Sequence, residues 1–431
     1  MEWHNWSGLE SATPRRVLTP GSAEEIAAVV AQAAGAGGRV KMVGTGHSFT
    51  GIAAPVDVML SPAGMTGILS VDREAMTVTA YAGTQLKALN AGLEVLGLSL
   101  HNMGDIAEQT LAGAVSTGTH GTGGRVAGLA AQLAGLTLVT GDGTLLSCSA
   151  TEHPEVYEMA RVGLGALGVL VTLTFRVEPL FGLRAVERPM PWADFLASFD
   201  ELTADAAHVD AYWFPHTDRI ATKRNTRVGL DSLDPLPAWR AWLDDDFLQN
   251  TLFGALTAGA NHRPAVIPRL NRLAASLLSP RSYADLAHRV FVAERRVVFR
   301  EMEYAVPLES GLDVLAECRR AIEASGLRIS FPVELRLARA EDVPLSTASG
   351  RDSFYLAFHT HRDMPHQAYF GLLEPILREA GGRPHWGKVH TRTKADLAPA
   401  YPRFEDFLAV RDRLDPHRVF TNPYLDRVLG P

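Results

Sequence analysis

The chain has 431 residues, 46% of them hydrophobic, which is enough for about two or three domains with substantial cores. Its 41 Lys and Arg against 48 Asp and Glu give a formal charge of −7 without a long basic run, so a nucleic-acid partner is not expected. The apolar runs 127–139 and 169–175 are shorter than the ~20 residues that cross a bilayer, and we expect a buried segment and a core strand rather than a membrane span.

The N-terminus and the cysteines both favour a cytoplasmic protein. Residues 1–5 show neither a basic nor an apolar leader segment, so no signal peptide is expected. Cys148 and Cys318 lie far apart in apolar contexts, which fits two buried free thiols in a reducing compartment.

The chain begins with a helix, a strand and a loop. A capping box at 22–25 precedes one apolar helix face, which predicts a helix over 23–34, and a strand is predicted over 39–43. The loop after this strand is rich in glycine and hydroxyl groups, and its bare backbone N–H groups can close on an anion such as a pyrophosphate. Alone, such a loop is more often a tight turn. Its residues are Val43, Gly44, Thr45, Gly46, His47 and Ser48.

A second segment of the same character covers 111–123. Two such segments in one domain can hold one long, doubly charged ligand from both sides. Its candidate ligand residues are Gly113, Ser116, Thr117, Gly118, His120 and Gly121.

Further elements of the first domain follow from periodicity and turn signals. A hairpin is predicted around 141–143, and a glycine-rich turn at 163–168 leads into a β-branched strand. The predicted strands are 56–60, 76–81, 136–140, 144–148 and 169–177, and the predicted helices are 85–96 and 154–161.

From residue 180 the chain changes to longer polar loops, including a Pro/Asp-rich segment at 231–246, and predicts a second domain of sheet and helices. Its predicted strands are 297–306, 329–338 and 353–361, with a helix at 312–325, a turn at 378–384, a helix at 401–410 and an irregular tail.

Three groups of polar residues in this second part are candidates for chemistry. Glu334 and Arg336 alternate onto one strand face, either as a solvated ion pair or as ligands of a substrate. Lys388 has apolar neighbours, so it is either a surface lysine or a desolvated ammonium that has a lowered pKa or stabilises negative charge. His359, His361, His385 and His390 suit zinc as a residue type but lack a familiar ligand spacing, so no metal is assigned.

The motifs GTGHSF, LAGAVSTGTHGTG and HWGK together resemble the aldonolactone oxidase and alditol oxidase group of the vanillyl-alcohol-oxidase flavoproteins. The resemblance runs nearly end to end. It implies an α+β protein of two domains, with a discontinuous FAD-binding domain (1–180, rejoined by 385–431) and a sheet-plus-helices substrate domain (181–384).

The resemblance also assigns roles. It implies FAD attached covalently to His47, and the adenine half of FAD beside the strand that begins at Gly168 and Val169. It places Gly104 and Asp105 at the reactive flavin edge, where glycine is typical of relatives that use oxygen readily and where Asp105 replaces the usual serine. Glu334, Arg336, His359 and Lys388 would meet the substrate, with His385 and Lys388 near the flavin.

The implied reaction is hydride transfer from a sugar-derived CH–OH group to FAD. The substrate is expected to be an aldono-1,4-lactone such as L-gulono-1,4-lactone, with a xylitol- or sorbitol-type polyol as the alternative. The acceptor is expected to be oxygen, giving hydrogen peroxide, with a dehydrogenase as the alternative. A flavin-binding protein without turnover and a metallohydrolase are rival interpretations.

Overall fold

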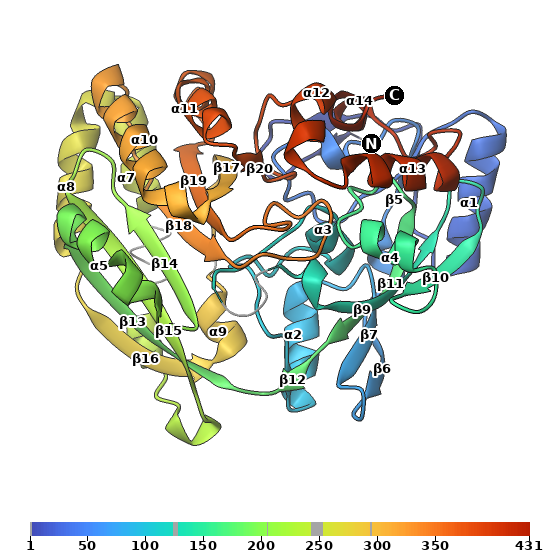
Figure 1. Cartoon of the computed structure of the whole chain (residues 1–431), viewed down its shortest axis with the longest axis horizontal. Helices are drawn as coiled ribbons and strands as arrows, with labels where there is room; N and C mark the ends of the chain where they lie inside the picture. The colour runs from blue at the N-terminus through green and yellow to red at the C-terminus, as the bar shows by residue number, and fades with distance from the viewer. Residues whose placement is uncertain (1, 124–127, 205, 243–252, 294) are drawn as a thin grey trace.

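The computed structural model describes residues 2–123, 128–204, 206–242, 253–293 and 295–431. Figure 1 shows two lobes side by side, the first built from the beginning and end of the chain and the second from its middle. The two chain termini lie close together at the top of the first lobe. Among the described residues, no helix is long and apolar enough to cross a bilayer.

The first lobe contains a parallel three-stranded sheet, β3-β5-β4, and an antiparallel five-stranded sheet, β10-β9-β11-β7-β6. Its strands are β1 (Trp3–His4), β2 (Ser11–Ala12), β3 (Arg16–Leu18), β4 (Val40–Met42), β5 (Val58–Leu60), β6 (Ile68–Asp72), β7 (Thr77–Tyr81), β8 (Leu98–Ser99), β9 (Leu133–Val139), β10 (Leu145–Ser149), β11 (Val169–Arg176) and β12 (Glu178–Pro179). Its helices are α1 (Ala23–Gly35), α2 (Leu86–Val95), α3 (Leu111–Ser116), α4 (Pro154–Ala160), α12 (Lys394–Leu397), α13 (Phe404–Leu414) and α14 (Pro423–Leu429).

Local sequence signals explain the first-lobe elements that were predicted. The Ser22 hydroxyl accepts a hydrogen bond from the Glu25 N–H at 3.2 Å, and α1 begins at Ala23, so Ser22 is the N-cap of this helix. The hairpin of β9 and β10 closes around 141–143 as predicted. The apolar run at 127–139 contains strand β9, while its residue 127 lies outside the described residues.

The second lobe is organised on one eight-stranded sheet with the order β16-β13-β15-β14-β18-β19-β17-β20. Its strands are β13 (Gly182–Pro191), β14 (His208–Trp213), β15 (Arg219–Val228), β16 (Arg281–Leu286), β17 (Phe299–Pro307), β18 (Val333–Ala338), β19 (Ser353–His361) and β20 (Arg383–Pro384). Its helices are α5 (Trp192–Ala204), α6 (Ala238–Ala241), α7 (Phe253–Asn261), α8 (Ile267–Leu277), α9 (Ala287–Phe291), α10 (Gly311–Ser325) and α11 (Gln367–Glu379).

The two faces of this sheet differ in chemistry. Met302, Leu335 and Phe358 point to one face and form a core cluster with residues of α5, α10 and α11, which cover it (Figure 1). Because side chains alternate along a strand, the neighbours of these residues point to the opposite face. These neighbours are Glu301, Glu303, Glu334, Arg336 and His359, so the second face of the sheet is polar although it is buried.

Several elements differ from the sequence predictions. The tail after 410 is not irregular, because Asn422 caps α14 by accepting from the Leu425 N–H at 2.9 Å. The second glycine-rich segment begins as helix α3, and the predicted turn at 378–384 is the end of α11 followed by β20. The strands β13 to β16 were not predicted, because their exposed positions are polar and Pro189 and Pro191 argue against a strand. Part of the Pro/Asp-rich segment, 243–246, lies outside the described residues.

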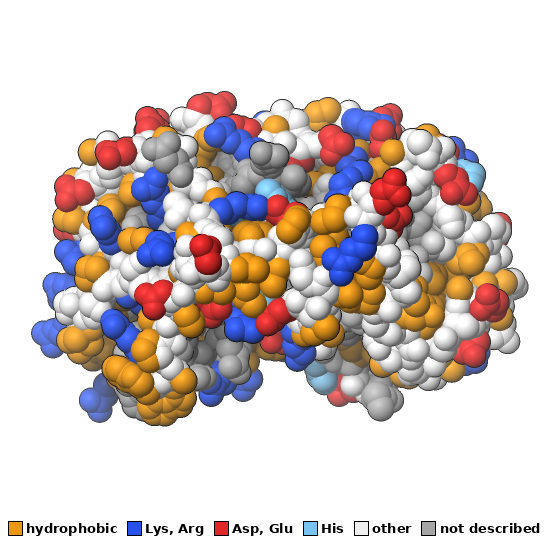
Figure 2. All heavy atoms as spheres, turned by 90° about the horizontal axis from the view of Figure 1, so that it is seen from below, with side chains coloured by type: hydrophobic (Ala, Val, Ile, Leu, Met, Phe, Trp, Pro, Cys, Tyr) orange, Lys and Arg blue, Asp and Glu red, His pale blue; other side chains and the backbone are white. Residues whose placement is uncertain are grey.

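Charge and cysteine chemistry agree with the sequence analysis. On the face shown in Figure 2, acidic and basic side chains are interspersed over both lobes. Cys148 and Cys318 are both buried free thiols. Burial raises the pKa of each thiol to about 12, so neither is a reactive thiolate at neutral pH.

Candidate active site

A cleft in the first lobe lies between the two glycine-rich segments, and its empty space of about 850 Å³ is partly open to solvent. Gly44 to Ser48 line it from the first segment and residues within 109–117 from the second, together with residues within 164–170 and Phe420. The two segments therefore come together around one cavity, as their composition predicts.

Glycine is required in the first of these loops. A Cβ at Gly44 would collide with the hydroxyl of Thr110, which belongs to the opposite wall, and Gly46 has a φ of +70°. The two walls thus approach each other through bare backbone, which exposes N–H groups to a ligand.

The lining of the cleft fits a dianionic dinucleotide such as FAD in charge. None of the described residues that line it is acidic, and they include hydroxyl groups from both walls and one lysine, Lys41. Of the predicted cofactor residues, those lining the cleft are Gly44, Thr45, Gly46, His47, Ser48, Gly113, Ser116, Thr117, Gly168 and Val169. Outside its lining lie Val43, Gly104, Asp105, Gly118, His120, Gly121, His385 and Lys388.

His47 is held in place at the mouth of the first loop. Its Nδ1 lies 3.0 Å from the Thr45 hydroxyl, and its ring stacks on Trp6 with 5.9 Å between centroids. Burial lowers the pKa of His47, Glu108 raises it and Lys388 lowers it, with a net decrease. The imidazole is therefore neutral near pH 7 and keeps a lone pair available as a nucleophile.

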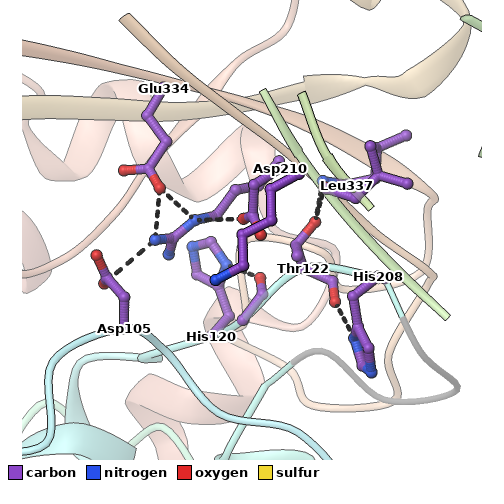
Figure 3. A network of polar contacts seen from close by, with 12 residues as sticks. Asp105, His120, Thr122, His208, Asp210, Glu334 and Leu337 are labelled. Carbon is purple, nitrogen blue, oxygen red and sulfur yellow. Dashed lines mark hydrogen bonds and ion pairs between the residues drawn. The ribbon is translucent and has the colours of Figure 1, made fainter. Parts of the chain in front are cut away.

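Arg336 is the centre of a buried ion-pair network on the polar face of the second-lobe sheet (Figure 3). Its guanidinium donates to Glu334 Oε1 from Nε (3.0 Å) and Nη2 (2.7 Å), and it lies 3.2 Å from Asp105 Oδ1 and 3.5 Å from Asp210 Oδ1. The Glu334 side chain is only 7% exposed, so the alternative of a solvated surface pair is wrong. The same Glu334 oxygen accepts from the Tyr212 hydroxyl at 2.9 Å.

Asp105 links this network to the first lobe. Burial raises the pKa of Asp105, but Arg336 and Arg295 lower it by more, so the carboxylate stays ionised. Arg295 Nη2 donates to its Oδ2 at 2.9 Å. Across the network, burial raises the pKa of Asp210 to about 6, with Arg336 lowering it and Glu334 raising it.

Lys388 forms a second buried pair, with Glu301 of β17. Its Nζ donates to Glu301 Oε2, and its side chain is 17% exposed, which excludes the surface-lysine alternative. Burial lowers the pKa of Lys388, but Glu301 and Glu303 raise it by more, so the net shift is upward and the lowered-pKa alternative is wrong. Lys388 is a fixed cation, suited to stabilising negative charge.

His359 lies beside the same carboxylate, with Nε2 3.6 Å from Glu301 Oε1. Burial lowers the pKa of His359, yet Glu301 raises it by more, so its pKa is above the usual value. One carboxylate on β17 thus faces two predicted catalytic residues, and it raises the pKa of both.

Glu303, two residues along β17, joins His120 and His385. His120 Nε2 is 3.2 Å from Glu303 Oε1, and its ring lies over Tyr355 with 3.9 Å between centroids. Among the residues that the structure describes, these three form the group whose ligand atoms converge, within 4.8 Å of one another. The pKa of His385 is lowered to about 3, chiefly by burial, and its Nδ1 accepts from the Gly387 N–H at 3.0 Å. The contact between His120 and Glu303 and the hydrogen bond to His385 thus give each of the three side chains a partner within the protein.

The C-terminal histidines considered for a metal site separate in the fold. His359 pairs with Glu301, His361 lies 3.5 Å from Asp363, and His390 Nε2 lies 2.9 Å from the Tyr424 hydroxyl. They do not form a common ligand set.

Gly104 packs against the second glycine-rich segment. A Cβ at this position would lie 3.1 Å from the His120 carbonyl oxygen and 3.3 Å from Thr119 Cγ2. A side chain here would therefore press on the loop that carries His120.

Sequence reasoning missed the acidic partners of the predicted cations. Glu301 and Glu303 alternate with Met302 and Tyr304 in β17, which is the same two-residue spacing that singled out Glu334 and Arg336. This alternation could have been found in the sequence, because the strand was predicted. No sequence signal pointed to Asp210, Tyr212 and Arg295, because they meet the site only through sheet pairing and loop packing.

Fold and site together define an FAD-dependent oxidoreductase of the vanillyl-alcohol-oxidase type. An FAD-binding domain family matches residues 14–149, and the D-arabinono-1,4-lactone oxidase family matches residues 173–428. The chain belongs to this D-arabinono-1,4-lactone oxidase family.

Relatives and solved structures agree with this assignment. The chain is 40% identical to an L-gulono-1,4-lactone dehydrogenase of Mycobacterium tuberculosis, over 100% of this chain and 99% of that protein. It is 33% identical to an L-gulonolactone oxidase of Bos taurus, over 99% of this chain and 98% of that protein. A cholesterol oxidase of Brevibacterium sterolicum has a similar fold, with a TM-score of 0.81 at 19% identity over 100% of this chain and 96% of that one.

Proposed function

We propose that this enzyme oxidises a CH–OH group of an aldono-1,4-lactone such as L-gulono-1,4-lactone. The observation that carries the proposal is the polar sheet face, on which Lys388 with Glu301 and Arg336 with Glu334 present fixed donors and acceptors to a polyhydroxylated ligand. The names of the 40% and 33% identical relatives support the lactone. A polyol substrate is the alternative, which the HWGK segment shared with alditol oxidases supports.

Bound FAD supplies the hydride acceptor. Arg336 and Glu334 orient neighbouring substrate hydroxyls. Their mutual hydrogen bonds use Arg336 Nε and Nη2 and Glu334 Oε1, so Arg336 Nη1 and Glu334 Oε2 are not used in this pair. Lys388 stabilises the oxygen that loses its proton as the hydride leaves, and Glu301 keeps that ammonium charged. His359 lies beside the same carboxylate.

We further propose a histidyl-linked FAD at His47 and oxygen as the acceptor, with hydrogen peroxide as the product. The neutral, oriented imidazole of His47 supports the first proposal. Glycine at position 104 supports the second. A dehydrogenase with another acceptor is the alternative, since the relatives include both a dehydrogenase and an oxidase.

We infer three chain divisions and a cytoplasmic location. The proposed divisions are an FAD-binding domain at 1–180, a substrate domain at 181–384 and a returning segment at 385–431. Shared packing supports them, since Trp386 and Phe407 belong to the same core cluster as Leu89 and Leu173. The two free, buried thiols support a reducing compartment.

The test is one substrate panel, run with oxygen and with a dye acceptor. Aldono-1,4-lactones are expected to reduce the flavin faster than xylitol or sorbitol, and air alone is expected to sustain turnover with peroxide release. Faster reduction by the polyols would contradict the lactone. Turnover only with the dye would contradict the oxidase.

A further inference from the structure

Lys41 is a buried lysine in the cofactor cleft, outside the residues that face the substrate. It is the middle residue of β4, three positions before Gly44, and it is 5% exposed. Val40, Lys41 and Met42 all line the cleft, and Val40 also belongs to an apolar core cluster. Its Nζ donates to the carbonyl oxygens of Gly165 and Phe420, both at 3.2 Å.

The charge of this ammonium has no direct counter-ion among the described residues. An ammonium has three donors, and the two carbonyl groups account for two of them. Asp415 is the nearby carboxylate, but it accepts from the backbone N–H groups of Val419 (2.7 Å) and Phe420 (3.0 Å). The pKa of Lys41 is lowered to about 7, chiefly by burial and also by Arg411, while Asp415 raises it.

The position of Lys41 selects the half of the cofactor that it can reach. Lys41 Nζ lies at Gly165 and Phe420, and the same cleft is lined by Gly168 and Val169, where the family resemblance places the adenine half of FAD. His47 also lines the cleft, and its charge environment includes Lys388 of the substrate site. An oxygen-rich anionic group in the cleft would meet Lys41 as the single ammonium of the described lining.

We propose that Lys41 is a cofactor-binding residue whose ammonium donates its third hydrogen bond to an oxygen of the ADP half of FAD. The chemistry is that of a cation partly deprived of water, which gains a ribose or diphosphate oxygen when the cofactor enters. This inference rests on FAD as the cofactor and not on the proposed lactone or acceptor. Failure of either of those leaves it unaffected.

A dependence of FAD affinity on pH follows. Without cofactor, Lys41 is half protonated near pH 7, and an anionic partner raises its pKa, so binding takes up a proton. Affinity is therefore highest below pH 7. Above pH 7 it falls by up to about tenfold for each pH unit, until the pKa of the bound form is reached. Arg411 stays charged through this range, since its pKa, lowered chiefly by burial, is about 10, while burial raises the pKa of Asp415.

The experiment measures FAD dissociation from the full-length enzyme between pH 6 and pH 9, by the recovery of flavin fluorescence on dilution. If the flavin is covalent, the His47→Ala enzyme replaces the wild type as the parent. At pH 6, Lys41→Met is expected to raise the Kd of FAD by about tenfold or more and to remove its pH dependence. Lys41→Arg keeps the charge and is expected to stay close to the parent at pH 6, without the fall above pH 7.

ADP provides the control for location, because it carries the adenosine diphosphate half alone. Its competition with FAD is expected to weaken by the same factor in Lys41→Met. An unchanged Kd for FAD or for ADP in Lys41→Met would overturn the proposal, whether or not the variant melts at a lower temperature than the parent. If Lys41→Met does not fold, the parent decides the matter, since an FAD affinity independent of pH between 6 and 9 also overturns it.

Discussion

At the scale of single residues, the site depends on buried charges that compensate each other. Glu301 contacts both Lys388 and His359. The Arg336 guanidinium contacts the carboxylates of Glu334, Asp105 and Asp210. Removing one member leaves its partner buried and unpaired, which costs more than the pair itself contributes. Substitutions in this group therefore act on catalysis through their neighbours as well as directly.

Lys388→Met tests the role of the fixed cation. The substitution keeps the length of the side chain and removes the charge beside the reacting oxygen. Flavin reduction under anaerobic conditions is expected to slow by roughly 10²-fold or more, while FAD stays bound. Near-normal reduction in stopped-flow traces would remove Lys388 from the proposed mechanism.

Glu301→Gln tests the pairing by its pH dependence. In the wild type the carboxylate raises the pKa of Lys388, so the ammonium stays charged up to and beyond pH 10. Without Glu301, its upward effect is lost while burial and Glu303 remain, so the pKa lies lower than in the wild type and the rate of flavin reduction is expected to fall at a lower pH. Rates between pH 6 and pH 9.5 give the measurement, with Glu178→Gln, in a peripheral pair with Arg227, as the control. An unshifted basic limb in Glu301→Gln would show that the charge of Lys388 does not depend on this pair.

At the scale of elements, two glycine-rich segments and one polar sheet face do different work. The segments place bare backbone around the cofactor cleft, and the sheet presents fixed charges from β17, β18 and β19. The glycine-rich segments adjoin regular elements, and the charged residues lie within strands. Regular structure therefore fixes the geometry of both.

The first loop predicts the fate of the flavin on denaturation. With His47 as the attachment point, the flavin is expected to stay with the polypeptide in SDS or acid and to be released from His47→Ala. Flavin fluorescence of the protein band in a gel gives the answer. Free flavin from the denatured wild type would show that the linkage is absent.

Gly104→Ala tests the acceptor. The new methyl group lies 3.1 Å from the His120 carbonyl oxygen, so the adjoining segment must move by a few tenths of an ångström at the proposed flavin edge. Reoxidation of the reduced enzyme by oxygen is expected to slow, with substrate reduction within about twofold of the wild type. Gly371→Ala is the matched control, because a Cβ there has nothing within 4 Å. Equal reoxidation rates in Gly104→Ala and Gly371→Ala would exclude this position as the determinant.

At the scale of the whole molecule, the end of the chain completes the first lobe. Phe404, Phe407 and Leu425 are buried in the same core cluster as Leu111 and Leu138. Asn422 holds this segment in place, since its Nδ2 lies within hydrogen-bond distance of the carbonyl oxygens of Gly51 (2.9 Å), Ile52 (3.1 Å) and Ala54 (3.0 Å). The two N–H groups of this amide are thus shared among three acceptors just beyond the first cofactor loop.

Asn422→Ala is expected to destabilise the protein by about 2–4 kcal/mol, because it removes the cap of α14 and leaves buried carbonyl groups without a donor. Urea unfolding, followed by tryptophan fluorescence, measures the change. Ser22→Ala removes only an exposed cap of α1 and is expected to cost about 1 kcal/mol. Equal losses in the two variants would contradict the role given to Asn422.

Much of this architecture could be predicted from the sequence. Apolar periodicity and caps predicted α1, α2, α10 and the strands β7, β11, β17 and β19 to within a few residues, because these elements bury one regular face. The glycine-rich segments and the pair Glu334 and Arg336 were identifiable from spacing alone. The assignment to lactone oxidases followed from motifs, and the family comparisons confirm it.

Other features were decided by tertiary structure. The polar strands β13 to β16 have weak local signals and form because each pairs with neighbours in the eight-stranded sheet. Lys388 and Glu301 are 87 residues apart, so their ion pair and the upward pKa shift that it causes depend on packing across the chain. The local sequence determined which residue types lie on each strand face. Only the pairing of distant strands decided which charges meet, because the pKa of a buried group depends on neighbours that are far away in the sequence.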